Sequence, residues 1–332
     1  MRKLTSILLS IVISLSSLST AFAWGPDGHK TVGQIASLRI NQTTQQKIAA
    51  ILKSGETLAS ISTWADTVKD RMGQSDPDKD TRAFLKDKVH NGNNASWHFD
   101  DLPLGCNRYD TCNGFTTLTD VVHMINVCIT TLQGQSVPGH PLSKRNALRL
   151  LVHFVGDLHQ PMHVASGYIN EHGPGNTILI VSDPSQINDG IKKDVGGNVL
   201  IIDKTTEKNL HSFWDGDLVH LMMDSSNTNT IAAFAQLLKT TITPQPDWDP
   251  QGPITTWAAQ WATDSLHQSR DHSYNSVVIV RKFKLKKGKN KGKFAYEITR
   301  DENYDQTNTP VVGTQLAKGG YRLAALLDEI FK

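Results

Sequence analysis

Seven segments of this 332-residue chain repeat an apolar residue every three or four positions. That period gathers the apolar side chains on one face of an α-helix. The sequence therefore predicts a mainly α protein, a multi-helix bundle. The predicted helices lie within residues 29–40, 41–54, 117–132, 143–159, 229–242, 254–269 and 319–331.

Two pairs of segments break this pattern and favour short β-hairpins or extended excursions: residues 176–183 with 198–204, and residues 277–285 with 293–299. The second pair is joined by a Gly- and Lys-rich run. Polar stretches at residues 73–82 and 241–253 are predicted to be surface loops. Because neither an internal repeat nor a dividing linker is found, residues 24–332 are predicted to form a single domain.

The first 23 residues have the three parts of a secretory signal peptide. These are basic Arg2 and Lys3, an apolar run at residues 7–18, and the small-residue signature Ala21-Phe22-Ala23. Removal of residues 1–23 would leave Trp24 as a free N-terminus. Its amine and carbonyl oxygen could chelate a metal with His29, or Trp24 could be an ordinary residue near a chain end. Since nothing else resembles a membrane anchor, a periplasmic or secreted protein is expected.

The cysteines and the net charge further limit the classes of protein to which this chain can belong. Cys106 and Cys112 flank a loop and are expected to form a disulfide, whereas Cys128 is expected to be a buried free thiol. The formal net charge is only +2, so the whole chain is not a typical basic nucleic-acid binder. The basic run from Arg281 to Lys293 could attract phosphate, but a solvated hairpin tip is the favoured interpretation.

Histidine and aspartate at helical spacing carry the predicted chemistry. His153 precedes Asp157 by four positions, and His211 precedes Asp215 by four. Such pairs share a helix face and can hold one metal, although a single pair could equally form a surface hydrogen bond. Further candidates are His29, Asp66, His98 and His163. Imidazole and carboxylate without thiolate favour zinc, and so many ligands would fill two or three sites.

Seven ordered motifs resemble the S1/P1 nuclease family, secreted trinuclear-zinc nucleases that share a fold with zinc phospholipases C. They are WGxxGHxxVGxIA from residue 24, STWAD from 62, WHF from 97, HFVGDLHQPMHV from 153, GGN from 196, NLHxxWD from 209 and QLxxxGxRLAxLL from 315. The resemblance covers nearly all of residues 24–332. One departure is Lys318-Gly319-Gly320, where the family often has Ala before Gly.

The resemblance implies three Zn²⁺ ions per chain. The first would be held by Asp66, His98, His153 and Asp157. The second would be bound by the Trp24 amine and carbonyl, by His29 and by Asp157 as the bridge. The third would be held by His163, His211 and Asp215.

The resemblance also implies a reaction in which a hydroxide bridging the close zinc pair attacks phosphorus in line with the departing 3′ oxygen. Asp66 and Asp157 would be catalytic through the metals. Lys69 would neutralise charge on the phosphate, although a solvated lysine at a helix end is an equal alternative.

Substrate contacts are implied at three positions. Phe99 would stack a nucleobase, Asp101 would accept hydrogen bonds from the base edge, and Asn198 would bind substrate. The alternatives are a core aromatic for Phe99, a cap for Asp101 and a plain Gly-Gly-Asn turn for Asn198. His159 lies between ligands but out of phase with both, so it has either a supporting hydrogen-bonding role or a packing role.

The favoured hypothesis is a secreted zinc-dependent endonuclease that cleaves single-stranded RNA and DNA to 5′-phosphorylated products, with 3′-nucleotidase activity. A zinc-dependent phospholipase C is the alternative, and a zinc-binding protein without catalysis is a third hypothesis. Single-stranded nucleic acids and 3′-nucleotides are the expected partners. A monomer without stable membrane association is expected.

Overall fold

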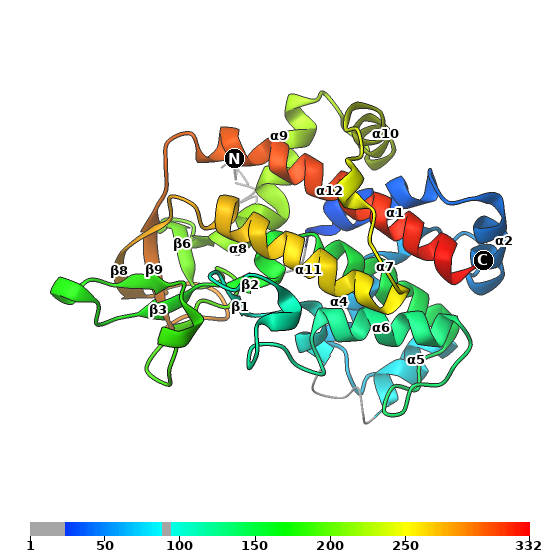
Figure 1. Cartoon of the computed structure of the whole chain (residues 1–332), viewed down its shortest axis with the longest axis horizontal. Helices are drawn as coiled ribbons and strands as arrows, with labels where there is room; N and C mark the ends of the chain where they lie inside the picture. The colour runs from blue at the N-terminus through cyan, green and yellow to red at the C-terminus, as the bar shows by residue number, and fades with distance from the viewer. Residues whose placement is uncertain (1–23, 88–93) are drawn as a thin grey trace, which may run out of the picture.

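Helix α7 (Lys144–Leu158) lies at the centre of the computed structural model, which describes residues 24–87 and 94–332. Every residue of α7 after Lys144 is buried, because α6 (Val121–Leu132), α1 (Pro26–Ser37) and α12 (Tyr304–Ile330) pack around it. Figure 1 shows the helices filling most of the molecule. The mainly α prediction is confirmed. The remaining helices are α2 (Gln42–Ile51), α3 (Leu58–Ile61), α4 (Trp64–Lys69), α5 (Lys79–Lys86), α8 (Leu210–Ser212), α9 (Leu218–Ser225), α10 (Ile231–Thr241) and α11 (Trp257–Gln268).

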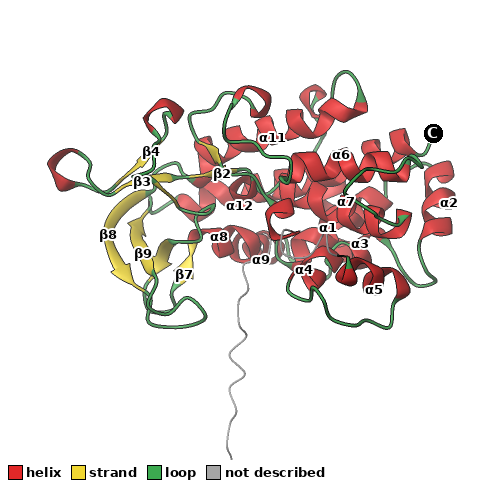
Figure 2. Cartoon of the chain, turned by 90° about the horizontal axis from the view of Figure 1, so that it is seen from below, coloured by secondary structure: helices red, strands yellow, loops and turns green. Residues whose placement is uncertain are grey.

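The strands gather at one end of the molecule, away from the C-terminus (Figure 2). β1 (Leu102–Pro103) pairs with β2 (Ala165–Ser166) in parallel. Two further sheets have the orders β4-β3-β5 and β7-β6-β9-β8. Their strands are β3 (Tyr168–Asn170), β4 (Leu179–Val181), β5 (Lys192–Lys193), β6 (Leu200–Asp203), β7 (Lys208–Asn209), β8 (Val278–Lys284) and β9 (Phe294–Thr299).

Of the two predicted hairpins, one is confirmed and one pairing is wrong. β8 and β9 pair antiparallel as expected. Residues 176–183 and 198–204 contain strands, but β4 pairs with β3, and β6 pairs with β7 and with β9. An alternating apolar pattern identifies a strand without specifying its partner: β3 and β7 are near in the sequence, whereas β9 is distant.

Each predicted helical segment contains a helix, but two boundaries differ. Residues 73–82 were predicted as a loop, whereas α5 begins at Lys79, because the Asp78 side chain caps it by accepting from Thr81 N at 2.8 Å. Helix α12 begins at Tyr304, well before residue 319, and continues through Pro310. Its Gly320, the glycine of the family motif, packs so closely on α1 that a Cβ atom would lie 2.5 Å from Ile35 Cβ.

The structure confirms the predicted pairing of the three cysteines. Cys106 and Cys112 form a disulfide, and Cys128 is a buried free cysteine on α6. The predicted loop at residues 241–253 is irregular apart from a short turn, yet its Trp248 is buried. The predicted signal peptide, residues 1–23, lies outside the described residues.

Candidate metal centre

Two predicted ligands, His153 and Asp157, stand one turn apart on buried α7. The His153 ring is held by its Nδ1–H, which donates to the Ser62 carbonyl at 2.6 Å. Its Nε2 then faces Asp157 Oδ2 at 3.2 Å and Asp66 Oδ1 at 3.8 Å. The short connection between α3 and α4 thus fixes the direction in which this imidazole presents its lone pair.

All eight predicted side-chain ligands come together in three buried groups. Within each group the potential ligand atoms lie within 4.8 Å of one another. The groups are His29–Asp66–His153, His98–His153–Asp157 and His163–His211–Asp215. The third matches the predicted third site. The first two share His153, so together they form one continuous cluster.

Asp157 contacts the imidazoles of several elements. Its Oδ1 lies 3.3 Å from His29 Nε2 and 3.9 Å from His163 Nδ1, and its Oδ2 lies 3.0 Å from His98 Nδ1. The two oxygens of Asp157 therefore face different imidazoles, and its role as the bridge stays a prediction. His29 can approach α7 because residue 156 is glycine, where a Cβ would lie 2.7 Å from His29 Nδ1.

The third group is oriented by main-chain carbonyls. His163 Nδ1–H donates to His98 O at 2.8 Å, and His211 Nδ1–H donates to Gly196 O at 2.7 Å. Both Nε2 atoms are then unprotonated, and they face each other at 3.0 Å. Two lone pairs at this distance repel unless a cation or a proton lies between them.

Burial keeps the imidazoles in the form that binds metal. Desolvation lowers the pKa of His29 and of His98 to about 4, and that of His211 to about 3. They are therefore neutral near pH 7. Burial also raises the pKa of Asp215, because its charge is removed from water.

Several ligand atoms have no hydrogen-bond partner among the described residues: both ring nitrogens of His29, Asp157 Oδ1 and Asp215 Oδ2. Buried polar atoms are rarely left unpaired in proteins. A set of nitrogen and carboxylate oxygen ligands with orphaned atoms aimed at shared points fits divalent zinc.

The N-terminal part of the predicted site lies against the third group. Trp24 is fully buried, and Gly25 N donates to the Asp215 carbonyl at 2.7 Å. Gly28 permits this packing, since a Cβ there would lie 2.7 Å from Trp24 Cβ. The main chain of Trp24 is thereby placed next to a ligand residue. Chelation by its amine and carbonyl stays a prediction.

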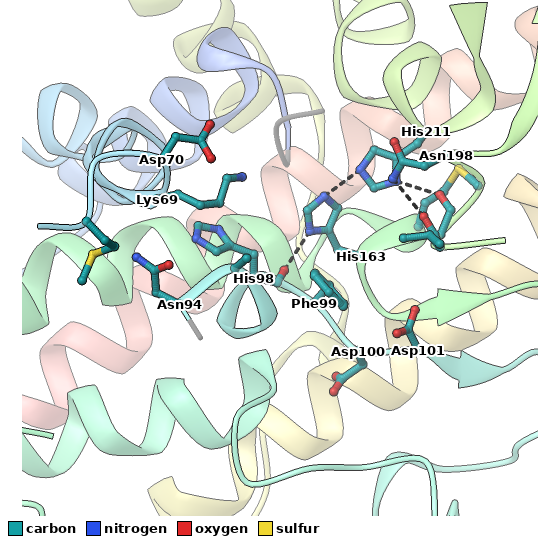
Figure 3. Close-up of a pocket in the computed structure, with 15 residues that line it drawn as sticks. Lys69, Asp70, Asn94, His98, Phe99, Asp100, Asp101, His163, Asn198 and His211 are labelled. Carbon is teal, nitrogen blue, oxygen red and sulfur yellow. Dashed lines mark hydrogen bonds between the residues drawn. The ribbon is translucent and has the colours of Figure 1, made fainter. Parts of the chain in front are cut away.

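A cavity of about 440 Å³ opens over the ligands His98, His163 and His211. Figure 3 shows Lys69 on one side of His98 and Phe99, Asp101 and Asn198 toward the other. All four of these predicted residues line the cavity. Phe99 is half-buried.

The polar side chains in the cavity already have protein partners. Lys69 Nζ lies 2.9 Å from Asp66 Oδ1. Asp101 Oδ1 accepts from Ser166 Oγ at 2.5 Å, and its Oδ2 pairs with Lys193 at 2.8 Å. Asn198 Nδ2 donates to Val195 O at 2.9 Å within the left-handed Val195–Gly197 turn. Asn198 therefore stabilises the turn and also lines the cavity, and its role in substrate binding stays a prediction.

Sequence reasoning missed the residues that hold the ligands. Gln160 Nε2 donates to Asp215 Oδ1 at 2.6 Å. Gly196 positions His211 through its carbonyl, and only glycine fits, because a Cβ would lie 2.3 Å from Met162 O. Gln160 and Gly196 stand within the HQPMH and GGN motifs, which was the available signal. The contact to Ser62 could not be recognised in the sequence, because it uses the main-chain carbonyl and not the side chain.

His159 is a packing and hydrogen-bonding residue away from the ligands. Its Nδ1–H donates to Val155 O at 2.7 Å, and its Nε2 lies 3.2 Å from Arg322 Nη1. Arg322 also pairs with Asp264, which Lys318 contacts at 2.9 Å. This network joins the end of α7 to α11 and α12.

Comparisons with known proteins agree with this geometry. A family model described as S1/P1 Nuclease matches residues 24–332. The chain is 27% identical to Nuclease S1 of Aspergillus oryzae, over 96% of each chain. It is 25% identical to Endonuclease 2 of Arabidopsis thaliana, over 93% of this chain and 90% of that protein. With Nuclease P1 of Penicillium citrinum the identity is 26%, over 92% and 97%.

Proposed function

The chain belongs to the S1/P1 nuclease family, and from this premise we propose that it is a zinc-dependent endonuclease of single-stranded RNA and DNA. It is a hydrolase that acts on nucleic acids, as its family membership establishes. The proposed products carry 5′-phosphates, and a 3′-mononucleotide is proposed to lose its phosphate. Because the chain belongs to a family of hydrolases, the hypothesis of a zinc-binding protein without catalysis is wrong.

One observation carries the proposal: three buried His/Asp groups occur in the fold, and members of two of them, His98, His163 and His211, line a cavity together with Phe99. Bound zinc ions would supply a hydroxide nucleophile and stabilise charge on the phosphate and leaving oxygens. The proposed ligands are Trp24, His29, Asp66, His98, His153, Asp157, His163, His211 and Asp215.

The chain's own residues are proposed to orient the substrate. Phe99 stacks the base beside the scissile phosphate, which requires an unpaired base and so favours single strands. Asn198 and Asp101 border the same half of the cavity and contact the base edge. Lys69, held by Asp66, presents its charge to the phosphate. The His153 and His211 rings are held in fixed orientations by their Nδ1–H bonds.

We further propose that residues 24–332 form a single domain, made after removal of residues 1–23 and exported to the periplasm or the medium as a monomer. No helix within residues 24–87 and 94–332 is long and apolar enough to cross a membrane. Single-stranded nucleic acids and 3′-nucleotides are the proposed partners.

The test is elemental analysis of the mature protein, with hydrolysis of single-stranded RNA, a 3′-mononucleotide and phosphatidylcholine by the same preparation. About three zincs per chain and cleavage of the first two substrates would support the proposal. Zinc with cleavage of the lipid alone would move the assignment to a phospholipase C, the alternative function. Fewer than two zincs in the active protein would refute the trinuclear site.

A further inference from the structure

Ion pairs connect the rim of the cavity to the β8–β9 hairpin. Lys193 on β5 pairs with Asp101 at 2.8 Å. The adjacent Lys192 pairs with Glu171 at 3.1 Å, and Lys282 on β8 reaches the same carboxylate at 2.8 Å. Glu171 directly follows β3, and β4 contacts β8. A row of amines therefore leads from the cavity across β5 and β3 to β8.

The row continues along one face of the hairpin. Lys284 and Phe294 are cross-strand partners, and Lys282 pairs with Tyr296 two residues along. Residues two apart on a strand point to the same side of the sheet. The Lys282 and Lys284 amines lie 4.2 and 5.2 Å from the centre of the Phe294 ring. Phe294 is nevertheless 52% exposed, so part of this aromatic side chain is open to solvent beside the two lysines.

The hairpin tip adds cations that no carboxylate neutralises. Within the described part of the chain no ion pair is formed by Lys284, Lys286, Lys289, Lys291 or Lys293, and all five are exposed. Glu207 accepts from the main-chain N–H groups of Lys286 and Lys287. Glu297 pairs with Arg281 and Lys204, on the face opposite Lys282. Glu297 is thus paired with other cations, and Glu207 is the one carboxylate that the described hydrogen bonds place at the tip.

We propose that this row, from Lys193 through Lys282, Lys284 and Phe294 to the tip lysines, binds the part of a single-stranded nucleic acid that extends beyond the cavity. The proposal rests on the proposed nuclease function. Lysines spaced along a strand with an exposed aromatic ring between them match the two needs of an unpaired strand, namely phosphate neutralisation and base stacking. The row crosses the neighbouring strands β5, β3 and β4, which alone cover roughly 10 Å at the usual spacing of about 5 Å between strands, so it serves polymers and not mononucleotides.

The test compares two charge-matched triple variants. The first replaces three unpaired tip lysines: Lys289→Gln, Lys291→Gln and Lys293→Gln. The control replaces three exposed lysines on helices at the other end of the molecule: Lys79→Gln, Lys86→Gln and Lys144→Gln (Figure 1). Steady-state kinetics are measured on a single-stranded 20-mer and on a 3′-mononucleotide over a range of salt concentrations, and Phe294→Ala is measured alongside.

For the tip variant we expect KM on the 20-mer to rise roughly tenfold at low salt, with kcat unchanged. The slope of log(1/KM) against log salt should become shallower by about 2, as the loss of three phosphate contacts predicts. Phe294→Ala should raise KM on the 20-mer without altering the slope. KM for the mononucleotide should stay the same in every variant, as should all constants of the control.

Equal effects of the tip and control variants, or an unchanged KM for the 20-mer, would overturn the proposal. The same holds if the tip variant loses binding to phosphatidylglycerol vesicles while its kinetics on the 20-mer are unaltered, because the row would then face an anionic membrane. Failure of the proposed nuclease function is a separate result, since the unaltered enzyme would then cleave neither substrate.

Discussion

Asp157 is the residue on which the metal centre depends most. Its two oxygens contact imidazoles carried by α1, by the turn that ends at His98 and by α7 itself. Replacement Asp157→Asn keeps the shape but removes the charge that two metals would share. We expect kcat/KM to fall at least about 100-fold, with loss of bound zinc measured by elemental analysis.

His159→Ala is the matched comparison, since His159 is equally buried and stands two residues away. It contacts Arg322 and no ligand side chain. The variant should retain its zinc and most of its kcat, and lose about 2 kcal/mol of unfolding free energy, because the buried ring leaves a cavity and Arg322 Nη1 loses one of its contacts while keeping Asp264. If both variants lose zinc equally, the bridging role of Asp157 is wrong.

Trp24 supports a second prediction at this scale. Its neighbour Gly25 is tied to Asp215, and its own side chain is buried against Gly28. A protein that retains one residue before Trp24 would carry an amide in place of the proposed amine ligand. We expect such a protein, verified by mass spectrometry, to bind one zinc fewer and to lose most of its activity. Full activity with an unchanged zinc content would remove Trp24 from the ligand set.

Among the helices, α7 is held in place by ion pairs at its N-terminal half. Arg145 pairs with Asp78 at 2.7 Å and with Glu56, and Arg149 pairs with Glu56 at 2.8 Å. These contacts fasten the starts of α3 and α5 to the helix that carries His153. Hydrogen bonds from Arg145, from the main chain at Lys53 and from Arg149 outweigh burial and hold the pKa of Glu56 at about 2.

The sign of the resulting pH dependence follows from this depressed pKa. The charged form of Glu56 stabilises the folded state at pH values above its ordinary pKa, and the contribution is lost as pH falls toward 2. Glu56→Gln should cost about 2 kcal/mol at pH 7 and nothing near pH 2. Urea denaturation of both proteins from pH 7 to pH 2 measures the difference. A constant difference across that range would mean that Glu56 acts through packing and not through charge.

Helices and strands were predicted correctly from the sequence where the pattern lay within one continuous segment of the chain. The helical period of residues 143–159 specified α7, and the lysine-rich turn specified the β8–β9 hairpin. The prediction failed where a strand pairs with a distant segment or where a helix extends beyond the segment with the apolar period. The pairing of β6 with β9 joins residues nearly 100 positions apart, and α12 extends through Pro310. Neither feature is determined by a local period.

At the scale of the whole molecule, the candidate ligands were predictable because each is a chemically distinctive residue in an ordered motif. The main-chain groups that orient these ligands were not predictable. The carbonyls of Ser62, His98 and Gly196 hold three imidazoles, and a carbonyl is present at every position of a sequence. The row from Lys193 to the hairpin could not be predicted from the sequence either, because Glu171 links lysines from segments that are distant in the chain.

The three ligand groups join α1, α4, α7, α8 and the turns at His98 and His163, so metal binding should stabilise the entire helical body. Without cations, one oxygen each of the buried Asp157 and Asp215 carboxylates has no hydrogen-bond partner among the described residues, and the facing Nε2 lone pairs of His163 and His211 repel each other. Binding to the folded state alone adds roughly 4 kcal/mol per site at a free zinc concentration 1,000 times Kd. We therefore expect chelation to lower the Tm by more than about 10 °C, and added Zn²⁺ to restore it. Calorimetry of the native, chelated and reloaded protein measures this change. A Tm within about 2 °C in all three states would show that the ligand groups are stable by themselves, and would contradict a fold built around the metals.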